Sequence, residues 1–189
     1  MRPTRLLSLS LSLVALASLV AGLSLSARTS GAADPPAKND MVERGRYLVT
    51  VSGCNDCHTP GYLYGQPDMN RMLSGSEIGW PGPWGLAFAA NLTPDEETGL
   101  GKWSDEEVLA AIQNGQRPDG RMLAPIMPYM NFMNLTDEDA KAIVAYLRSI
   151  PAVKHEEPAP VPPGEKYDGS AIVFPAPPAW DVPPPPEKK

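Results

Sequence analysis

The feature that most constrains this chain is Cys54-Asn55-Asp56-Cys57-His58, a C-x-x-C-H run that contains both cysteines of the 189-residue sequence. Two thiols separated by two residues can add to the two vinyl groups of a haem, and the adjacent histidine is then placed to coordinate the iron from one side. The run therefore predicts one covalently attached haem c, with His58 as an iron ligand.

Three other interpretations of this run are weaker. A thioredoxin-like C-x-x-C lies in a βαβ pattern, whereas residues 40–53 are short, charged and helical in pattern. A structural zinc site takes four nitrogen or sulfur ligands, and the only other histidine, His155, lies in a proline-rich stretch. A structural disulfide between Cys54 and Cys57 would not need His58.

The N-terminal stretch has the pattern of an export signal. It begins with Arg2 and Arg5, continues with the apolar residues 6–27, and reaches small residues at 31–33. We expect residues 1–33 to be a cleaved signal peptide. Because the stretch is about long enough to cross a bilayer, an uncleaved membrane anchor is the alternative. In both cases the rest of the chain is expected to be periplasmic or otherwise exported, with membrane association only through the N-terminus.

The expected mature protein is acidic. Loss of residues 1–33 removes three arginines and no acidic residue, so the formal net charge changes from −6 to −9. Such a surface argues against nucleic acid or anionic lipid as partners and permits docking to a basic patch on another protein. Because net charge also serves solubility, it does not identify the partner.

A first helix is expected just before the haem motif. After a polar linker at residues 34–39, Asn39 or Asp40 can cap a helix from Met41 to about Val51, and Gly53 ends it. Its apolar positions, which are expected to face the core, are Val42, Tyr47, Leu48 and Val51.

Two further helices follow a long loop. About forty residues after the motif are rich in Gly, Pro and aromatic residues with little periodicity, so we expect a loop that packs on the haem. Ser104 and Glu107 form a capping-box pattern for a helix that stops at Gly115. Thr136 opens the last helix and Pro151 closes it, with an expected buried side of Ile143, Val144, Tyr146, Leu147 and Ile150.

The chain therefore reads as one folded domain, residues 40–152, followed by a proline-rich tail, residues 153–189. Twelve prolines lie between residues 151 and 189, so the tail cannot form a second core and should be extended. It either wraps the domain through Ile172, Val173, Phe174 and Trp180 or extends into solvent.

The order of helix, C-x-x-C-H, long loop, helix, methionine loop and closing helix resembles the class I cytochrome c family. More specifically, the chain resembles the cytochrome subunits of bacterial membrane-bound alcohol, aldehyde and gluconate dehydrogenases. The similar segments are Gly-Arg-Tyr-Leu at residues 45–48, Asn-Leu-Thr-Pro-Asp at 91–95, Met-Pro-Tyr at 127–129 and Tyr-Leu at 146–147. The resemblance covers residues 40–152 and implies an all-α cytochrome c fold, in which Gly45 meets Tyr146 where the first and last helices cross. Those subunits usually carry three C-x-x-C-H motifs, whereas this chain carries one.

The second axial ligand is expected to be a thioether from the loop between the last two helices. Four methionines qualify by position: Met122, Met127, Met130 and Met133. Methionine also fills gaps in cores, so most of these are packing residues. Met127 is favoured because Pro125 and Pro128 flank it and limit its backbone freedom, and the Met-Pro-Tyr resemblance points to the same residue; Met122 is the second choice.

Haem propionates are negative charges that need donors when they are buried. Candidate haem contacts are Arg46, Trp80, Trp84, Trp103 and Tyr129.

These observations predict an exported monohaem cytochrome c that carries single electrons and is not itself an enzyme. Its expected partners are a periplasmic or membrane dehydrogenase on one side and a terminal oxidase or another cytochrome on the other. The alternatives are a peroxidase-like haem enzyme and a gas-binding or sensing module. Both need an iron position that no side chain occupies, and a peroxidase usually also needs an acid or base above the iron. His58 is the only histidine within residues 40–152, which argues against the peroxidase-like enzyme.

Overall fold

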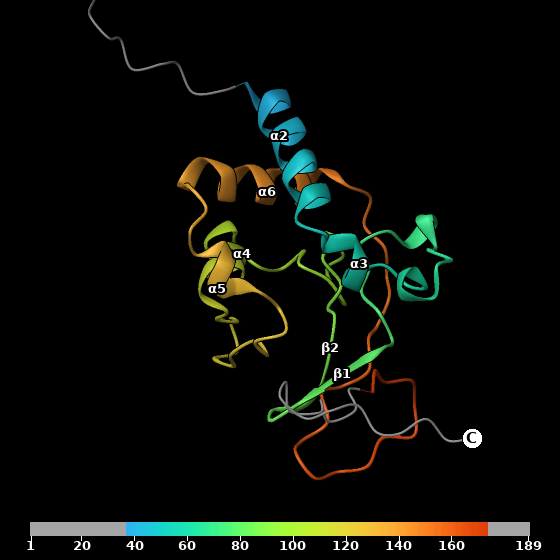
Figure 1. The fold of residues 1–189 in the computed structure, drawn as a ribbon. Coiled ribbons are helices and arrows are strands. Elements are labelled where there is room, and N and C mark those ends of the chain that lie inside the picture. The colour runs from blue at the N-terminus through green and yellow to red at the C-terminus, as the bar shows by residue number, and fades with distance from the viewer. Residues whose placement is uncertain (1–36, 174–189) are drawn as a thin grey trace, which may run out of the picture. The chain divides into compact units, whose positions relative to one another are not determined.

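The computed structural model describes residues 37–173, which belong to the compact unit Pro36–Lys189. The expected signal peptide, residues 1–33, lies outside the described residues, as do Phe174 and Trp180. The elements in chain order are α2 (Lys38–Val51), α3 (Cys54–His58), the 3₁₀ turns Tyr62–Tyr64 and Met69–Arg71, β1 (Gly79–Gly82), β2 (Gly85–Phe88), α4 (Asp105–Asn114), α5 (Tyr129–Phe132) and α6 (Asp137–Ser149) (Figure 1). No helix in this part of the chain combines the length and apolar character that a bilayer crossing requires.

Helices α2 and α6 cross closely, and Gly45 is the residue that permits the crossing. A Cβ atom on Gly45 would overlap the carbonyl oxygen of Ala142 and lie 2.8 Å from the Cβ of Tyr146. Any side chain at this position would therefore push the two helices apart. The predicted meeting of Gly45 and Tyr146 is confirmed. The core beside this crossing contains Leu48, Val49, Leu73, Leu100, Val108, Ala142, Ile143, Val144 and Leu147.

Helix α2 differs from its prediction at its start and on its face. It begins at Lys38, after Ala37, and no side chain caps it, so the expected cap at Asn39 or Asp40 is wrong and the linker ends earlier than residue 39. Tyr47 and Val51 were expected in the core but are 54% and 59% exposed. The buried residues are Gly45, Leu48 and Val49, because the side of α2 that contains Gly45 is the side that packs against α6.

The ends of α4 and α6 were predicted correctly. The Ser104 hydroxyl accepts from the backbone N–H of Glu107 at 3.2 Å, and the Glu107 carboxylate accepts from the N–H of Ser104 at 2.7 Å, which completes a capping box. Gly115 ends α4 with a φ of 69°, in the left-handed region. Thr136 accepts from the N–H of Asp139 at 3.1 Å and opens α6, which stops before Pro151.

The long loop contains an antiparallel hairpin that the sequence did not predict. Strands β1 and β2 pair with Gly79 opposite Phe88 and Gly82 opposite Gly85. Pro81 within β1 and the glycines at the strand ends hide the alternating pattern by which a strand is recognised. The domain is mostly helical with this one small sheet among the described residues.

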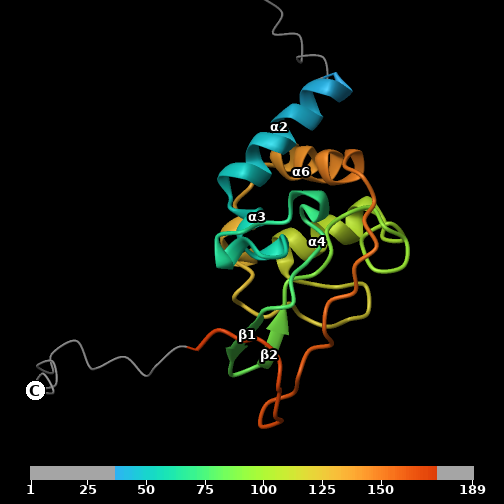
Figure 2. The same ribbon diagram turned by 90° about the vertical axis from the view of Figure 1, so that its right-hand side faces the viewer.

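The segment after α6 wraps the domain. Residues 153–172, called the strap below, run from the end of α6 past the hairpin, as the orange to red trace in Figure 2 shows. Val161 pairs with Leu86 of β2, and the N–H of Ile172 donates to the carbonyl of Gly79 in β1 at 2.9 Å. The sequence left open whether the tail wraps the domain or extends into solvent. The described part of the tail wraps the domain.

Candidate functional site

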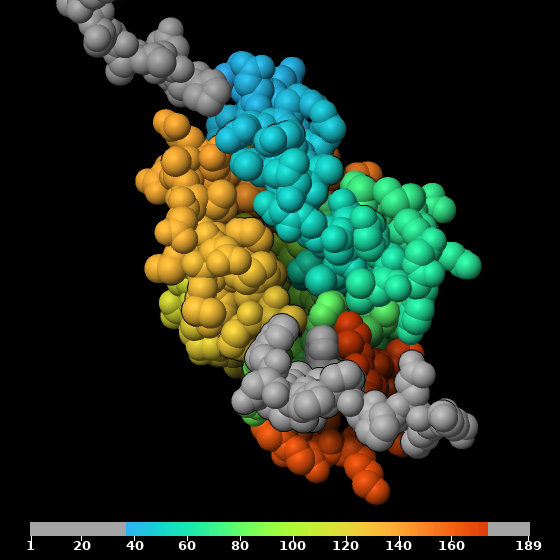
Figure 3. Space-filling view, in the orientation of Figure 1, coloured from blue at the N-terminus to red at the C-terminus, as the bar shows by residue number. Residues whose placement is uncertain are grey.

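A cavity of about 1060 Å³ lies between α3, the hairpin, α4, the methionine loop, α6 and the strap. Small-molecule sites typically have volumes of about 300–1,000 Å³, so the space is large enough for a sizeable cofactor. In the space-filling view a recess is visible between the yellow residues around α5 and the teal residues around α3 (Figure 3).

The C-x-x-C-H run forms α3, a single helical turn that begins after Gly53. Gly53 has a φ of 67° and separates α3 from α2. Positions three apart on a helix share a face, so Cys54 and Cys57 both line the cavity, as free thiols. Burial raises the pKa of the Cys54 thiol to about 11 and also raises that of Cys57. Both cysteines are therefore neutral thiols at neutral pH.

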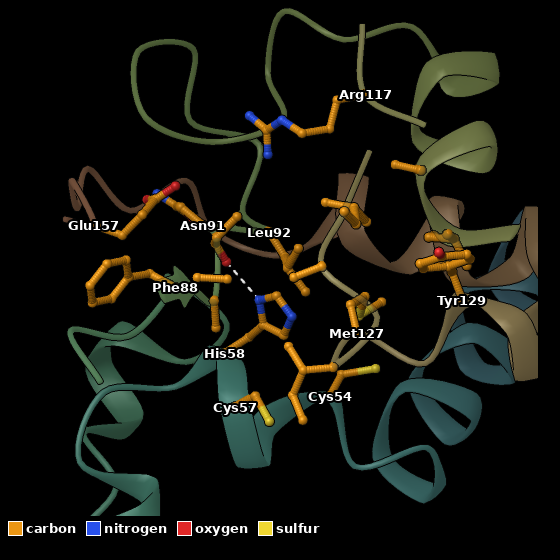
Figure 4. A pocket seen from close by; sticks show the side chains of 18 of the residues that line it. Cys54, Cys57, His58, Phe88, Asn91, Leu92, Arg117, Met127, Tyr129 and Glu157 are labelled. Carbon is orange, nitrogen blue, oxygen red and sulfur yellow. Dashed lines mark hydrogen bonds between the residues drawn. The ribbon is translucent and has the colours of Figure 1, made fainter. Parts of the chain in front are cut away.

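His58 is buried, with 8% of its surface exposed, and its ring has a fixed orientation. Its Nδ1 lies 2.7 Å from the carbonyl oxygen of Ala90 (dashed in Figure 4). Because a carbonyl oxygen only accepts, Nδ1 carries the hydrogen, and Nε2 is left with a lone pair. Burial lowers the pKa of His58, which favours the neutral ring that a metal requires.

Only two of the four candidate methionines line the cavity. Met127 is half-buried and lies near His58 in Figure 4, whereas Met122 is 59% exposed. Met130 and Met133 are 58% and 61% exposed and do not line it. Met127 sits in a tight turn, since its N–H donates to the carbonyl of Ala124 at 3.0 Å. Its sulfur is therefore the best-held thioether in the cavity wall.

Four of the five candidate haem contacts line the cavity, namely Trp80, Trp84, Trp103 and Tyr129. The indole N–H of Trp84 donates to the carbonyl of Trp80 at 3.1 Å, so that donor is already used within the hairpin. The fifth candidate, Arg46, was misplaced. It lies on the exposed face of α2, where it pairs with Glu43 at 2.8 Å, because the helix turns its glycine stripe inward.

Arg117, which was not among the residues predicted from the sequence, lines the cavity from the loop after α4. Its guanidinium lies 5.1 Å from the ring centre of Trp103, and its Nε is 3.5 Å from a carboxylate oxygen of Asp119. That Nε is buried and, within residues 37–173, has no hydrogen-bond partner. The contact with Asp119 is an ion pair without hydrogen-bond geometry, so this N–H is available to an acceptor in the cavity, and an anionic group there would satisfy it. The Arg-Pro-Asp-Gly sequence of residues 117–120 was the available signal.

The strap contributes two more wall residues that the sequence analysis did not anticipate, Glu157 and Pro160. Glu157 is half-buried, and burial is the main reason why the pKa of its carboxyl is raised. The strap therefore belongs to the site, although the sequence placed the domain boundary at residue 152.

The donors around the cavity fit a haem. In Figure 4 the two cysteines lie at one end of the cavity and Arg117 lies at the other. The vinyl groups of a haem occupy one side of its ring and the propionates the opposite side, so thiols at one end and a guanidinium at the other match both. Within the described ranges, no three His, Cys, Asp or Glu side chains are grouped to hold a metal ion, and His155 instead binds the carbonyl of Ser74 through Nδ1 at 2.8 Å.

Comparison with known proteins agrees with this geometry. The family model for cytochrome c matches residues 42–151. One component of the nicotinate dehydrogenase of Pseudomonas putida is 37% identical over 63% of this chain and 9% of its own length. The cytochrome c subunit of the quinone alcohol dehydrogenase of Gluconobacter oxydans is 37% identical over 68% of this chain and 25% of its own length. The cytochrome c subunit of the gluconate 2-dehydrogenase of Pantoea cypripedii is 34% identical over 60% of this chain and 24% of its own length. The chain thus spans about a quarter or less of these curated relatives.

Proposed function

The chain belongs to the cytochrome c family, and from this premise we propose that it carries single electrons through one covalently bound haem between a dehydrogenase and a downstream acceptor. The observation that supports the proposal most strongly is the common cavity wall, in which Cys54, Cys57, His58 and Met127 all take part. A haem held there supplies one-electron chemistry at its iron.

Each wall residue has a distinct role in the proposal. Cys54 and Cys57 form the thioether links by adding their S–H bonds across the two vinyl groups, which requires both cysteines to be reduced, as they are here. His58 presents Nε2 to the iron because Ala90 engages Nδ1. Met127 supplies the second axial ligand, and Arg117 supplies a charge-assisted hydrogen bond to a propionate.

The ligand set favours electron transfer over the other haem functions. With a histidine and a methionine on the two axial positions, no position is free for peroxide or a gas, and methionine raises the reduction potential relative to a second nitrogen ligand. Carbon monoxide should therefore leave the spectrum of the ferrous protein unchanged at neutral pH. Rapid carbon monoxide binding by the folded protein would favour a gas-binding module instead.

The electron donor is proposed from the relatives. Because similar sequences occur in the cytochrome subunits of alcohol and gluconate dehydrogenases, a flavin- or quinone-dependent dehydrogenase is the proposed donor, and a terminal oxidase or another cytochrome is the proposed acceptor. We also propose export to the periplasm, with residues 1–33 as the signal.

The test is substrate-dependent reduction in cell fractions that contain the native protein. Addition of the substrate of a candidate dehydrogenase should produce the ferrous haem spectrum of this chain, and a Cys54→Ser, Cys57→Ser double variant should abolish that signal. A haem signal confined to the cytoplasmic fraction would contradict export. A haem that no dehydrogenase substrate reduces would contradict the donor assignment.

A further inference from the structure

The strap holds Glu157 against the cavity by hydrogen bonds that lie just before it in sequence. The side-chain N–H of Asn91 donates to the carbonyl of Val153 at 2.7 Å, and the N–H of His155 donates to the hydroxyl of Thr98 at 3.1 Å. His155 also contacts the carbonyl of Ser74 through Nδ1 at 2.8 Å. Since Asn91 is 1% exposed, this attachment is part of the domain interior. Glu157 is therefore a fixed part of the wall.

The carboxylate of Glu157 lines the cavity and, among residues 37–173, has no ion pair and no hydrogen bond to another side chain; only backbone N–H groups interact with it. The wall contains two other acidic residues: Glu97, which pairs with Lys154, and Asp56, which lies between the two cysteines in α3. The three further acidic residues of the strap, Glu156, Glu165 and Asp168, are exposed and do not line the cavity. Glu157 is thus the acidic side chain that the strap presents to the cavity.

The charged groups that face Glu157 come from three segments. Arg117 lies beyond it at the same end of the cavity, away from the cysteines (Figure 4). The backbone N–H groups of Glu157 itself and of Asn91, in the loop after β2, lower the pKa of Glu157, and so do the positive charge of Arg117 and His155 on the strap. Burial outweighs these four effects, and the pKa of Glu157 is raised.

From this arrangement we infer that Glu157 is a redox-linked proton site. Glu157 takes up a proton from solvent when a protein donor delivers one electron to the centre, and it returns that proton to solvent when the electron passes to the acceptor. This inference rests on the proposed function, because it requires a one-electron centre in the cavity.

Two physical effects support this inference about Glu157. A haem in the cavity displaces water from around Glu157, which increases the cost of its charged form. The reduced centre carries one more negative charge than the oxidised centre, so the carboxylate is more basic in the reduced state. Reduction is therefore favoured by protons, and the midpoint potential falls as the pH rises between the pKa values of the oxidised and reduced forms.

The experiment is a spectroelectrochemical titration of the holoprotein across pH, with wild type, Glu157→Gln and the matched control Glu156→Gln. Wild type and Glu156→Gln should show a pH-dependent midpoint potential. Glu157→Gln should lose that dependence and keep the more positive, low-pH potential at every pH, because glutamine mimics the protonated acid. Redox difference infrared spectra should contain a carboxylic acid C=O band that disappears in Glu157→Gln only.

The haem propionates are the competing titratable groups. A pH dependence that persists unchanged in Glu157→Gln would assign the proton to a propionate and overturn the inference, as would a pH-independent potential in wild type. These results leave the proposed function intact as long as the haem is covalently bound and methionine-ligated. A chain that carries no haem would instead refute the proposed function.

Discussion

The Nδ1 atom of His58 lies 2.7 Å from the carbonyl oxygen of Ala90, across 32 residues of sequence. His58 ends α3, whereas Ala90 follows β2, so the unpredicted hairpin determines the orientation of the imidazole. A hydrogen bond of this kind fixes the tautomer of a ligating histidine and raises its basicity. The hairpin is therefore part of the haem site and not only a cover over it.

Replacing Met127 with alanine should remove the second axial ligand. The near-infrared sulfur-to-iron band of the ferric protein should disappear and the reduction potential should fall, because the methionine sulfur favours ferrous iron. Absorption spectroscopy and potentiometry of the purified holoprotein measure both effects.

Met130→Ala is the matched control, because Met130 is 58% exposed and does not line the cavity. It should keep both the band and the potential. If Met122→Ala removes the band while Met127→Ala keeps it, the ligand is Met122.

Arg117→Gln should lower the reduction potential by tens of millivolts. Arg117 is a positive charge in the cavity wall, and a nearby positive charge stabilises the reduced state relative to the oxidised state. The covalent haem and its methionine band should persist. Arg71→Gln is the control, since Arg71 pairs with Asp68 at 2.9 Å and does not line the cavity. Equal shifts in the two variants would contradict a role at the propionate.

Local signals in the sequence predicted the ends of α4 and α6 correctly. Ser104 with Glu107, Gly115 and Thr136 each act within a few residues, so their roles can be read without the tertiary structure. The C-x-x-C-H run is local in the same sense, because one helical turn brings Cys54 and Cys57 to one face.

The remaining parts of the site depend on contacts between distant segments. Arg46 and Arg117 are both arginines of the folded domain. The helix crossing at Gly45 turns Arg46 outward, whereas the loop after α4 places Arg117 in the cavity wall. Glu157 reaches the cavity because the strap pairs with Asn91 and Leu86, which lie more than sixty residues earlier. Proline-rich composition indicates an extended chain but not the surface that it follows.

Gly45→Ala should destabilise the fold by about 3 kcal/mol, because the added methyl would overlap the backbone of Ala142, which cannot rotate away. Urea unfolding followed by circular dichroism measures the change. Gly120→Ala is the control: Gly120 has a φ of 82° and open space around it, so only backbone strain of about 1 kcal/mol is expected. Similar losses in both variants would show that the helix crossing does not depend on Gly45.

A chain that ends at Ala152 should be less stable than one that ends at Val173. Loss of the strap removes the carbonyl of Val153 from the buried amide of Asn91, and an unpaired buried amide costs about 1–3 kcal/mol. Both chains should keep the methionine band, because His58 and Met127 precede the cut. Thermal unfolding compares the two, and equal melting temperatures would show that the strap contributes nothing to stability. Loss of the band in the shorter chain would show that the strap helps to build the ligand site.

The central claim, that Cys54 and Cys57 bind one haem covalently, is tested most directly by intact-protein mass spectrometry of the chain produced with a cytochrome c maturation system. The mass should exceed that of the polypeptide by one haem, and this added mass should remain after acid-acetone extraction. The Cys54→Ser, Cys57→Ser double variant should have the mass of the polypeptide alone. A wild-type chain that loses its haem in acid-acetone, or never carries it, would contradict the account.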